Sequence, residues 1–212
     1  MKFEEFIKIT GKLPVIKTEI ILAGVTEPDP VKVQISRWEK AGKLIQLKRG
    51  IYLLNETYRS TEVFEPYIAS ILIEPSYISM EKALEFHGII PEAVPVYTSL
   101  TTKRTAKFIN KAGVFEYHYI KKTLFWGYAS VEVNKQTAFV ATPEKALLDL
   151  FYIKGLKVTP EYISELRLQN TDQINIDKLM RHALRFNKPG VLRVAKMLKD
   201  HIISGRNTEK EL

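Results

Sequence analysis

Two short apolar runs joined by a basic turn constrain the fold of this chain more than any other feature. The runs LIQL and IYLL lie on either side of Lys48-Arg49-Gly50. Glycine allows the tight backbone turn that such a connection needs. Residues 41–54 therefore predict a β-hairpin with a cationic tip.

Three helical segments are expected before this hairpin. An apolar stripe near the amino terminus predicts the first, which Gly11 ends. The second should begin with Thr18 as its cap and end at Gly24. The third should begin with Asp29 as its cap and Pro30 at its first position. Three helices followed by two strands within the first 55 residues or so is the order of a winged helix-turn-helix.

The third segment has an apolar face and a cationic face. Val31, Ile35 and Trp38 follow the i, i+4, i+7 spacing of a buried helix side. In helix-turn-helix proteins the outward side of the second motif helix enters the major groove of DNA. Arginine suits a bidentate contact to guanine and glutamine a contact to adenine, whereas lysines anchor to phosphate. The candidate DNA-binding residues of this segment are Lys32, Gln34, Ser36, Arg37 and Lys40.

Four further candidates flank that segment. Lys48 and Arg49 at the hairpin tip would meet the neighbouring phosphates or the minor groove. Lys17 and Thr18, at the start of the second helix, would add phosphate contacts, because helix amino ends attract anions. Two alternatives stay open, namely that these cations form a solvated face and that the unit binds a protein instead of DNA.

The polar stretch NETYRST marks a boundary near residue 60, so that residues 1–58 form the DNA-binding domain and 62–205 a second domain. Helices are expected around Ile68 and after Ser79, and four segments between residues 94 and 141 have the β-branched and aromatic composition of a small sheet. Thr142 and Pro143 predict the start of another helix, and three more helical stretches follow. Residues 206–212 are expected to be a flexible tail. The predicted fold class is α+β.

The second domain carries a local excess of cations in two stretches of sequence. This surface could extend the DNA footprint, bind RNA or touch a protein partner, or it could be a solvated face. The candidate residues are Lys103, Arg104, Lys107, Lys111, Arg181, Arg185, Arg193 and Lys196.

Other chemistry-bearing residues in this domain favour structural roles. Aromatic residues such as Tyr117 and Trp126 lie between cations, but core packing of a small sheet is favoured over a stacking platform for single-stranded nucleic acid. Asp149 is expected to emerge at the surface of an apolar helix, with pairing to a buried base as the alternative.

Composition limits the remaining function classes. The formal net charge of +8 favours an anionic partner such as nucleic acid. The chain has no cysteine, its four histidines lack metal-ligand spacing, and no phosphate-binding loop or catalytic motif is present, so we expect no metal, no cofactor and no enzymatic activity.

Acids near the start argue against a signal peptide, and no apolar run approaches the length of a membrane span. A cytoplasmic protein without membrane contact is expected.

Several stretches together resemble one protein family. LKRGIYLL, PSYISMEKALEFHGIIPEAVPVYTSLTTKRT, FEYHYIKKTLFWGY and ATPEKALLDLFY, in this order, are similar to the AbiEi antitoxins of type IV toxin-antitoxin systems, regulators of viral defence. The resemblance covers most of residues 1–200. It implies an autorepressor that binds inverted repeats in its own promoter, and a second domain that counters a nucleotidyltransferase-like toxin. The alternative is a general winged-helix regulator, or a protein-binding adaptor, without a toxin partner.

Overall fold

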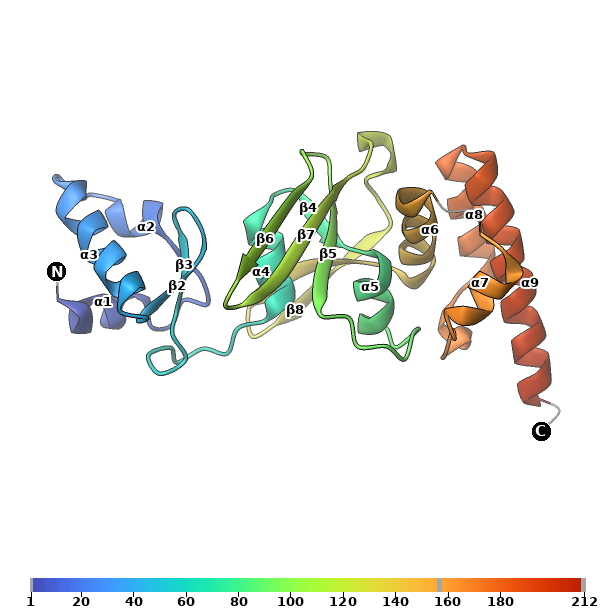
Figure 1. Ribbon diagram of the computed structural model, residues 1–212, viewed down its shortest axis with the longest axis horizontal. Helices are drawn as coiled ribbons and strands as arrows, with labels where there is room; N and C mark the ends of the chain where they lie inside the picture. Colours follow the sequence, from blue (N-terminus) through green and yellow to red (C-terminus); the bar gives the residue numbers. More distant parts are fainter. Residues whose placement is uncertain (1, 156–157, 211–212) are drawn as a thin grey trace.

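A computed structural model shows an elongated molecule in which three parts follow one another along the long axis (Figure 1). The structure describes residues 2–155 and 158–210. A small α/β unit lies at the amino-terminal end, a six-stranded sheet with its helices lies in the middle, and a group of helices closes the other end. The α+β class expected from the sequence is confirmed.

The amino-terminal unit combines three helices with a three-stranded sheet. Its elements are α1 (Phe3–Thr10), β1 (Ile16–Lys17), α2 (Thr18–Leu22), α3 (Pro28–Lys40), β2 (Leu44–Lys48) and β3 (Ile51–Leu54). The strand order is β1-β3-β2, and both pairs are antiparallel. The predicted hairpin is confirmed as β2 and β3.

The middle part is a mixed sheet with the strand order β6-β7-β5-β4-β9-β8. The pairs β4/β9 and β5/β7 are parallel, and the other pairs are antiparallel. Helix α4 packs against β4 and β9, and α5 against β5. The elements are α4 (Glu65–Leu72), β4 (Ser76–Ile78), α5 (Met80–Phe86), β5 (Val96–Thr101), β6 (Ala106–Asn110), β7 (Gly113–Tyr119), β8 (Tyr128–Val133) and β9 (Gln136–Ala141).

Four helices form the carboxy-terminal part, namely α6 (Pro143–Lys154), α7 (Pro160–Glu165), α8 (Ile176–Phe186) and α9 (Pro189–Lys210). Thr142 and Pro143 take the cap and first positions of α6, as predicted, and Gly155 ends it in the left-handed conformation. Two single turns of 3-10 helix, Lys122–Leu124 and Thr171–Gln173, complete the element list of the described residues. None of the helices within residues 2–155 and 158–210 is both long and apolar enough to cross a bilayer.

Several sequence-based boundaries were wrong. Helix α3 begins at Pro28 after Glu27, so Asp29 lies in its first turn and is not its cap. Thr18 is the first residue of α2 and Lys17 holds the cap position, while the Thr18 hydroxyl donates to the Gly50 carbonyl at 3.1 Å. Residues 206–210, expected to be part of a flexible tail, continue helix α9, and residues 211–212 of that tail lie outside the described part.

The amino-terminal sheet packs on the middle part of the molecule. Val15, Leu47, Ile51 and Leu53 are at most 8 % exposed and belong to the same apolar core as the central sheet. The residues facing the other way, around Trp38, form a separate small core with α1 and α3. The linker near residue 60 therefore joins two units that share buried apolar surface.

Candidate nucleic-acid interface

Helix α3 is oriented by the aromatic core beneath it. Trp38 lies with its ring centroid 5.2 Å from that of Phe3 and 4.7 Å from that of Phe6. Ile35 and Trp38 are buried, and Val31 is partly buried against the same cluster. This contact fixes which side of α3 faces outward, as the i, i+4, i+7 spacing predicted.

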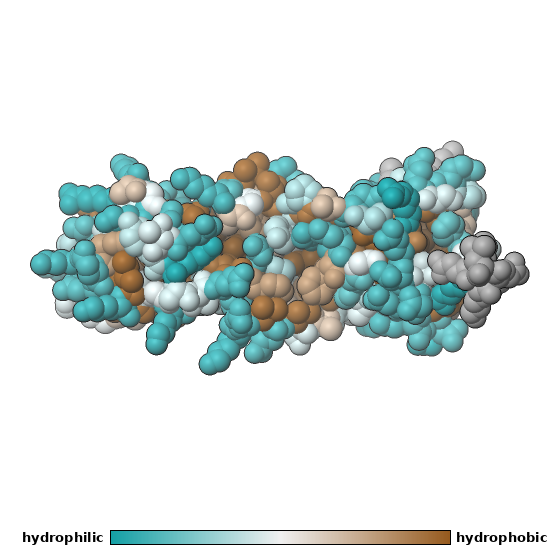
Figure 2. All heavy atoms as spheres, turned by 90° about the horizontal axis from the view of Figure 1, so that it is seen from below, coloured by the Kyte–Doolittle hydropathy of each residue, from teal (hydrophilic) through white to brown (hydrophobic). Residues whose placement is uncertain are grey.

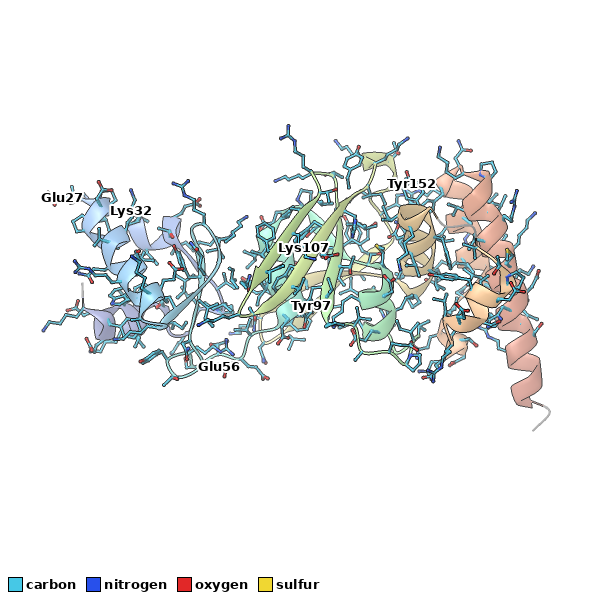
Figure 3. All side chains as sticks on the ribbon, in the orientation of Figure 1. Glu27, Lys32, Glu56, Tyr97, Lys107 and Tyr152 are labelled. Carbon is cyan, nitrogen blue, oxygen red and sulfur yellow. The ribbon has the colours of Figure 1, made fainter. Side chains whose placement is uncertain are left out.

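The outward side of α3 is cationic and open. Lys32, Ser36, Arg37 and Lys40 are all exposed, and Gln34 is partly exposed at the margin. The Lys32 ammonium forms a surface ion pair with Asp29 at 2.9 Å, and Lys32 projects from the end of the molecule farthest from the carboxy-terminal helices (Figure 3). The structure therefore brings Lys32, Ser36, Arg37 and Lys40 together on one accessible surface, and it places Gln34 at the edge of that surface.

The hairpin does not present both of its cations in the same way. The Lys48 ammonium donates a hydrogen bond to the Leu72 carbonyl at 2.5 Å, and burial together with nearby cations lowers the Lys48 pKa. Lys48 therefore points to the middle part of the molecule, contrary to the expectation of a free tip residue. Arg49 is exposed. The tip offers one accessible cation where the sequence suggested two.

Lys17 is likewise drawn to the middle part of the molecule. Its ammonium lies 3.7 Å from the Glu74 carboxylate in the loop between α4 and β4. The Thr18 hydroxyl is engaged by Gly50, so the start of α2 is tied to the hairpin. A site at the five-residue helix α2 would therefore have to break these contacts.

The candidate cations of the second domain lie in two separate places. Lys103, Arg104, Lys107 and Lys111 are on or beside β6, near the amino-terminal unit, whereas Arg181, Arg185, Arg193 and Lys196 are on α8 and α9 at the opposite end (Figure 1). All eight are exposed. Lys107 pairs with Glu116 at 2.6 Å, and the Arg185 guanidinium covers the Trp126 ring at 4.2 Å. These eight cations thus form two separate local sets.

The aromatic residues between these cations mainly pack internally, as expected. Tyr117 is fully buried, and its hydroxyl donates to the Ala69 carbonyl at 2.6 Å. Trp126 stacks on His182 with the ring centroids 4.8 Å apart, in addition to its contact with Arg185. Burial of Tyr117, and the contacts of His182 and Arg185 with the Trp126 ring, use surface that a stacked nucleic-acid base would need.

Asp149 does not emerge at the helix surface, and that expectation was wrong. It is fully buried and forms an ion pair with Lys145, which lies one turn earlier on α6. Tyr77 and Ser79 donate hydroxyl hydrogen bonds to the other carboxylate oxygen at 3.0 and 2.8 Å. The i, i+4 spacing of a lysine and an aspartate within the run EKALLDL was the available sequence signal.

Within residues 2–155 and 158–210, no group of three or more histidine or acidic side chains is arranged to hold a metal ion. No protein-family model matches the chain, and no curated protein matches its sequence.

Proposed function

We propose that the protein is a DNA-binding transcriptional regulator whose amino-terminal unit acts as a winged helix-turn-helix. The single observation that carries this proposal is the exposed cationic face of α3, held outward by the buried contacts of Trp38 and Ile35. The net charge of +8 adds the long-range attraction to a polyanion that DNA-binding proteins use.

Helix α3 is the element that enters the major groove in this proposal. Arg37 would contact guanine, Gln34 would contact adenine at the margin, and Lys32 and Lys40 would meet phosphates on either side. Arg49 would reach the flanking backbone from the hairpin. Lys48 is assigned to the junction with the middle part of the molecule because its ammonium already donates to Leu72.

The resemblance to the AbiEi antitoxins supports a more specific version of this proposal. The protein would repress its own promoter at inverted repeats, with one copy on each half-site, and would counter a nucleotidyltransferase-like toxin encoded beside it. The exposed cations on α8 and α9 are the surface we assign to this second activity, because they lie far from α3 (Figure 1).

Gel shifts with the protein's own promoter test the DNA-binding proposal. Arg37→Ala should weaken operator binding about fivefold or more and relax the preference at one base step, because a bidentate contact contributes about 1–3 kcal/mol. Arg167→Ala, an exposed arginine near α7, is the matched control and should leave binding unchanged. Equal loss on operator and random DNA in Arg37→Ala would remove Arg37 from base recognition.

The two hairpin cations should behave differently in the same assay. Arg49→Ala should weaken binding to all sequences and lower the slope of log affinity against log salt by about one, as loss of one phosphate contact does. Lys48→Met should change neither the affinity for DNA nor the salt slope appreciably. An equal effect of the two substitutions would show that Lys48 leaves Leu72 when DNA binds.

Coexpression with the adjacent gene product tests the antitoxin proposal. The Arg37→Ala variant should still restore growth while derepressing a promoter fusion, because the two activities are assigned to different ends of the molecule. Combined replacement of Arg181 and Arg185 by Ser should abolish the restoration of growth while the promoter fusion stays repressed. If every variant that loses repression also loses rescue, the antitoxin role is only transcriptional.

A further inference from the structure

A cavity of about 540 Å³ opens between α4 and the strands β8 and β9. Its walls carry four aromatic rings, from Tyr67, Phe125, Tyr128 and Phe139. Figure 2 shows apolar side chains gathered over the middle of the molecule, which the sheet and its helices form, between more polar ends. The volume lies within the range of about 300–1,000 Å³ that small-molecule sites occupy.

The rings are held in place by one another. Tyr128 stacks on the buried Tyr77 with centroids 4.7 Å apart, and it meets Phe125 and Phe139 edge to face at 5.3 and 5.7 Å. Tyr67 comes from α4 on the opposite wall. A ligand would therefore find aromatic surface on both sides without rearranging the sheet.

The charge of the cavity contrasts with that of the protein. Although the chain carries a net charge of +8, the residues that line the cavity include no lysine, arginine or histidine. The one ionisable carboxylate among them is Glu74, whose side chain is 64 % exposed near the mouth. Burial and the charge of Glu74 raise the Tyr67 pKa, so this side chain adds no negative charge to the lining.

One buried polar group in the lining has no partner. The Ser76 side chain is only 5 % exposed, and its hydroxyl makes no hydrogen bond within the described part of the chain. Because the hydroxyl oxygen itself is out of reach of solvent, it lies behind the cavity wall. The groups that a ligand would contact are the aromatic rings and Glu74.

We propose that this cavity is a binding site for an organic cation, such as a quaternary or substituted ammonium compound. Aromatic ring faces attract cations through their quadrupoles, and a carboxylate at the rim adds a direct charge contact. The same surroundings disfavour anionic ligands, for which the lining offers no cation. The proposal does not depend on DNA binding.

Lys17 would compete with such a ligand. Its ammonium already occupies the neighbourhood of Glu74, with 3.7 Å between the nitrogen and the nearer carboxylate oxygen. Lys17 belongs to β1 of the amino-terminal unit, whereas Glu74 belongs to the α4–β4 loop. A bound cation would therefore replace one of the contacts that join the two units.

Titration calorimetry on the purified full-length protein, without DNA, tests the proposal. The probes are benzyltrimethylammonium and choline, with 3,3-dimethylbutan-1-ol as the uncharged counterpart of choline. We expect saturable binding of the two cations and binding of the alcohol that is at least about fivefold weaker, the size of a cation–π contribution. Equal binding of choline and the alcohol, or no binding of any probe at millimolar concentration, would overturn the proposal.

Substitutions then locate the site. Glu74→Gln and Phe139→Ala should each weaken cation binding about fivefold, and both side chains are exposed enough for the fold to persist. Lys17→Gln should tighten binding, because it removes one of the two lysine charges, those of Lys17 and Lys48, that act on Glu74. Glu165→Gln, an exposed acid on α7, is the control. Binding that Glu74→Gln and Phe139→Ala leave unchanged would place the ligand elsewhere and overturn the assignment.

Discussion

Lys145 and Asp149 are two opposite charges that are entirely removed from solvent. Both side chains are 0 % exposed, and Lys145 also donates to the Tyr77 hydroxyl at 2.9 Å. The Lys145 ammonium lies 4.9 Å from the centroids of the Trp126 and Phe186 rings. Gly127 permits this arrangement, since a β-carbon there would come within 2.9 Å of the Lys145 side chain. Every member of the group has a partner, which is the condition under which buried charges are tolerated.

Removing one charge of this pair should therefore destabilise the protein strongly. Lys145→Met should lower the free energy of unfolding by about 3–5 kcal/mol, because Asp149 is left buried without a cation. Adding Asp149→Asn should recover part of the loss, since both charges are then gone while an oxygen still accepts from Tyr77 and Ser79. Urea denaturation measures both effects.

Lys154→Met, which breaks a partly exposed ion pair with Glu81, is the control and should cost less than about 1 kcal/mol. A double variant less stable than Lys145→Met would contradict this account.

His182 is held in its neutral form. Burial is the main reason that its pKa falls to about 4, and the charges of Lys178, Lys145 and Arg185 act in the same direction against that of Glu144. The neutral ring stacks on Trp126. His182 thus gives the carboxy-terminal part an acid-sensitive contact.

The sign of the pH effect follows from the lowered pKa. Below the ordinary histidine pKa of about 6.5, His182 is protonated in the unfolded chain but stays neutral in the folded protein. The free energy of unfolding therefore decreases as the pH falls towards 4. We expect His182→Gln to reduce the loss between pH 7 and pH 5 by about 1 kcal/mol, a value discounted because the ring is only half-buried. Denaturation curves at several pH values measure this. Burial alone would raise the Glu144 pKa, but Lys178 and backbone donors stabilise its carboxylate and lower the pKa below its ordinary value. Parallel pH profiles of the variant and the wild type would rule out His182 as the source.

At the scale of single elements, the hairpin of β8 and β9 shows where local sequence rules are sufficient. Asn134 and Lys135 form the two-residue turn between these strands, and they adopt positive φ values of 50° and 62°. This pair of left-handed residues is the type I′ geometry that matches the twist of two-residue hairpins. Asparagine tolerates it well, but lysine does so at a cost.

Glycine at position 135 should therefore stabilise the protein. Lys135→Gly should raise the free energy of unfolding by about 0.5–1 kcal/mol, because the strained lysine backbone is replaced by the Asn-Gly pair that this turn prefers. Thermal melting measures the gain. Lys135→Ala keeps the strain while removing the same exposed side chain, so it should bring no gain. Equal stabilisation by alanine and glycine would assign the effect to charge removal instead.

Elements that depend on distant partners were not readable from the sequence. Strand β4 has three residues and β1 has two, so neither offers a periodic pattern, and both exist because neighbouring strands supply their hydrogen bonds. The face of α3 was readable because its spacing is local. The contact of Lys48 with Leu72 joins residues 24 positions apart, and no local rule predicts it.

At the scale of the whole molecule, the hairpin of the amino-terminal unit is also a docking element. Apart from the Lys48 contact, the Asn110 side chain on β6 donates to the Leu47 carbonyl on β2 at 3.1 Å. Leu47 and Leu53 are 3 % and 1 % exposed within the larger core. The two units are therefore joined by apolar burial as well as by polar contacts at the rim, which distinguishes them from domains on a free linker.

A fragment ending at residue 60 should consequently behave worse than an independent domain. Its Leu47, Ile51 and Leu53 side chains lose the cover of the middle part of the molecule, and a contiguous apolar surface of this kind favours self-association. We expect the fragment to melt at a lower temperature than the full-length protein and to form oligomers in light-scattering measurements.

Replacing Leu47 and Leu53 by threonine in the fragment should reduce association, because both positions lie at the lost interface and threonine suits a strand. The same pair of substitutions in the full-length protein should destabilise it by more than about 2 kcal/mol, since there the leucines are packed. A monomeric fragment that is as stable as the full-length protein would show that the shared core contributes nothing to folding.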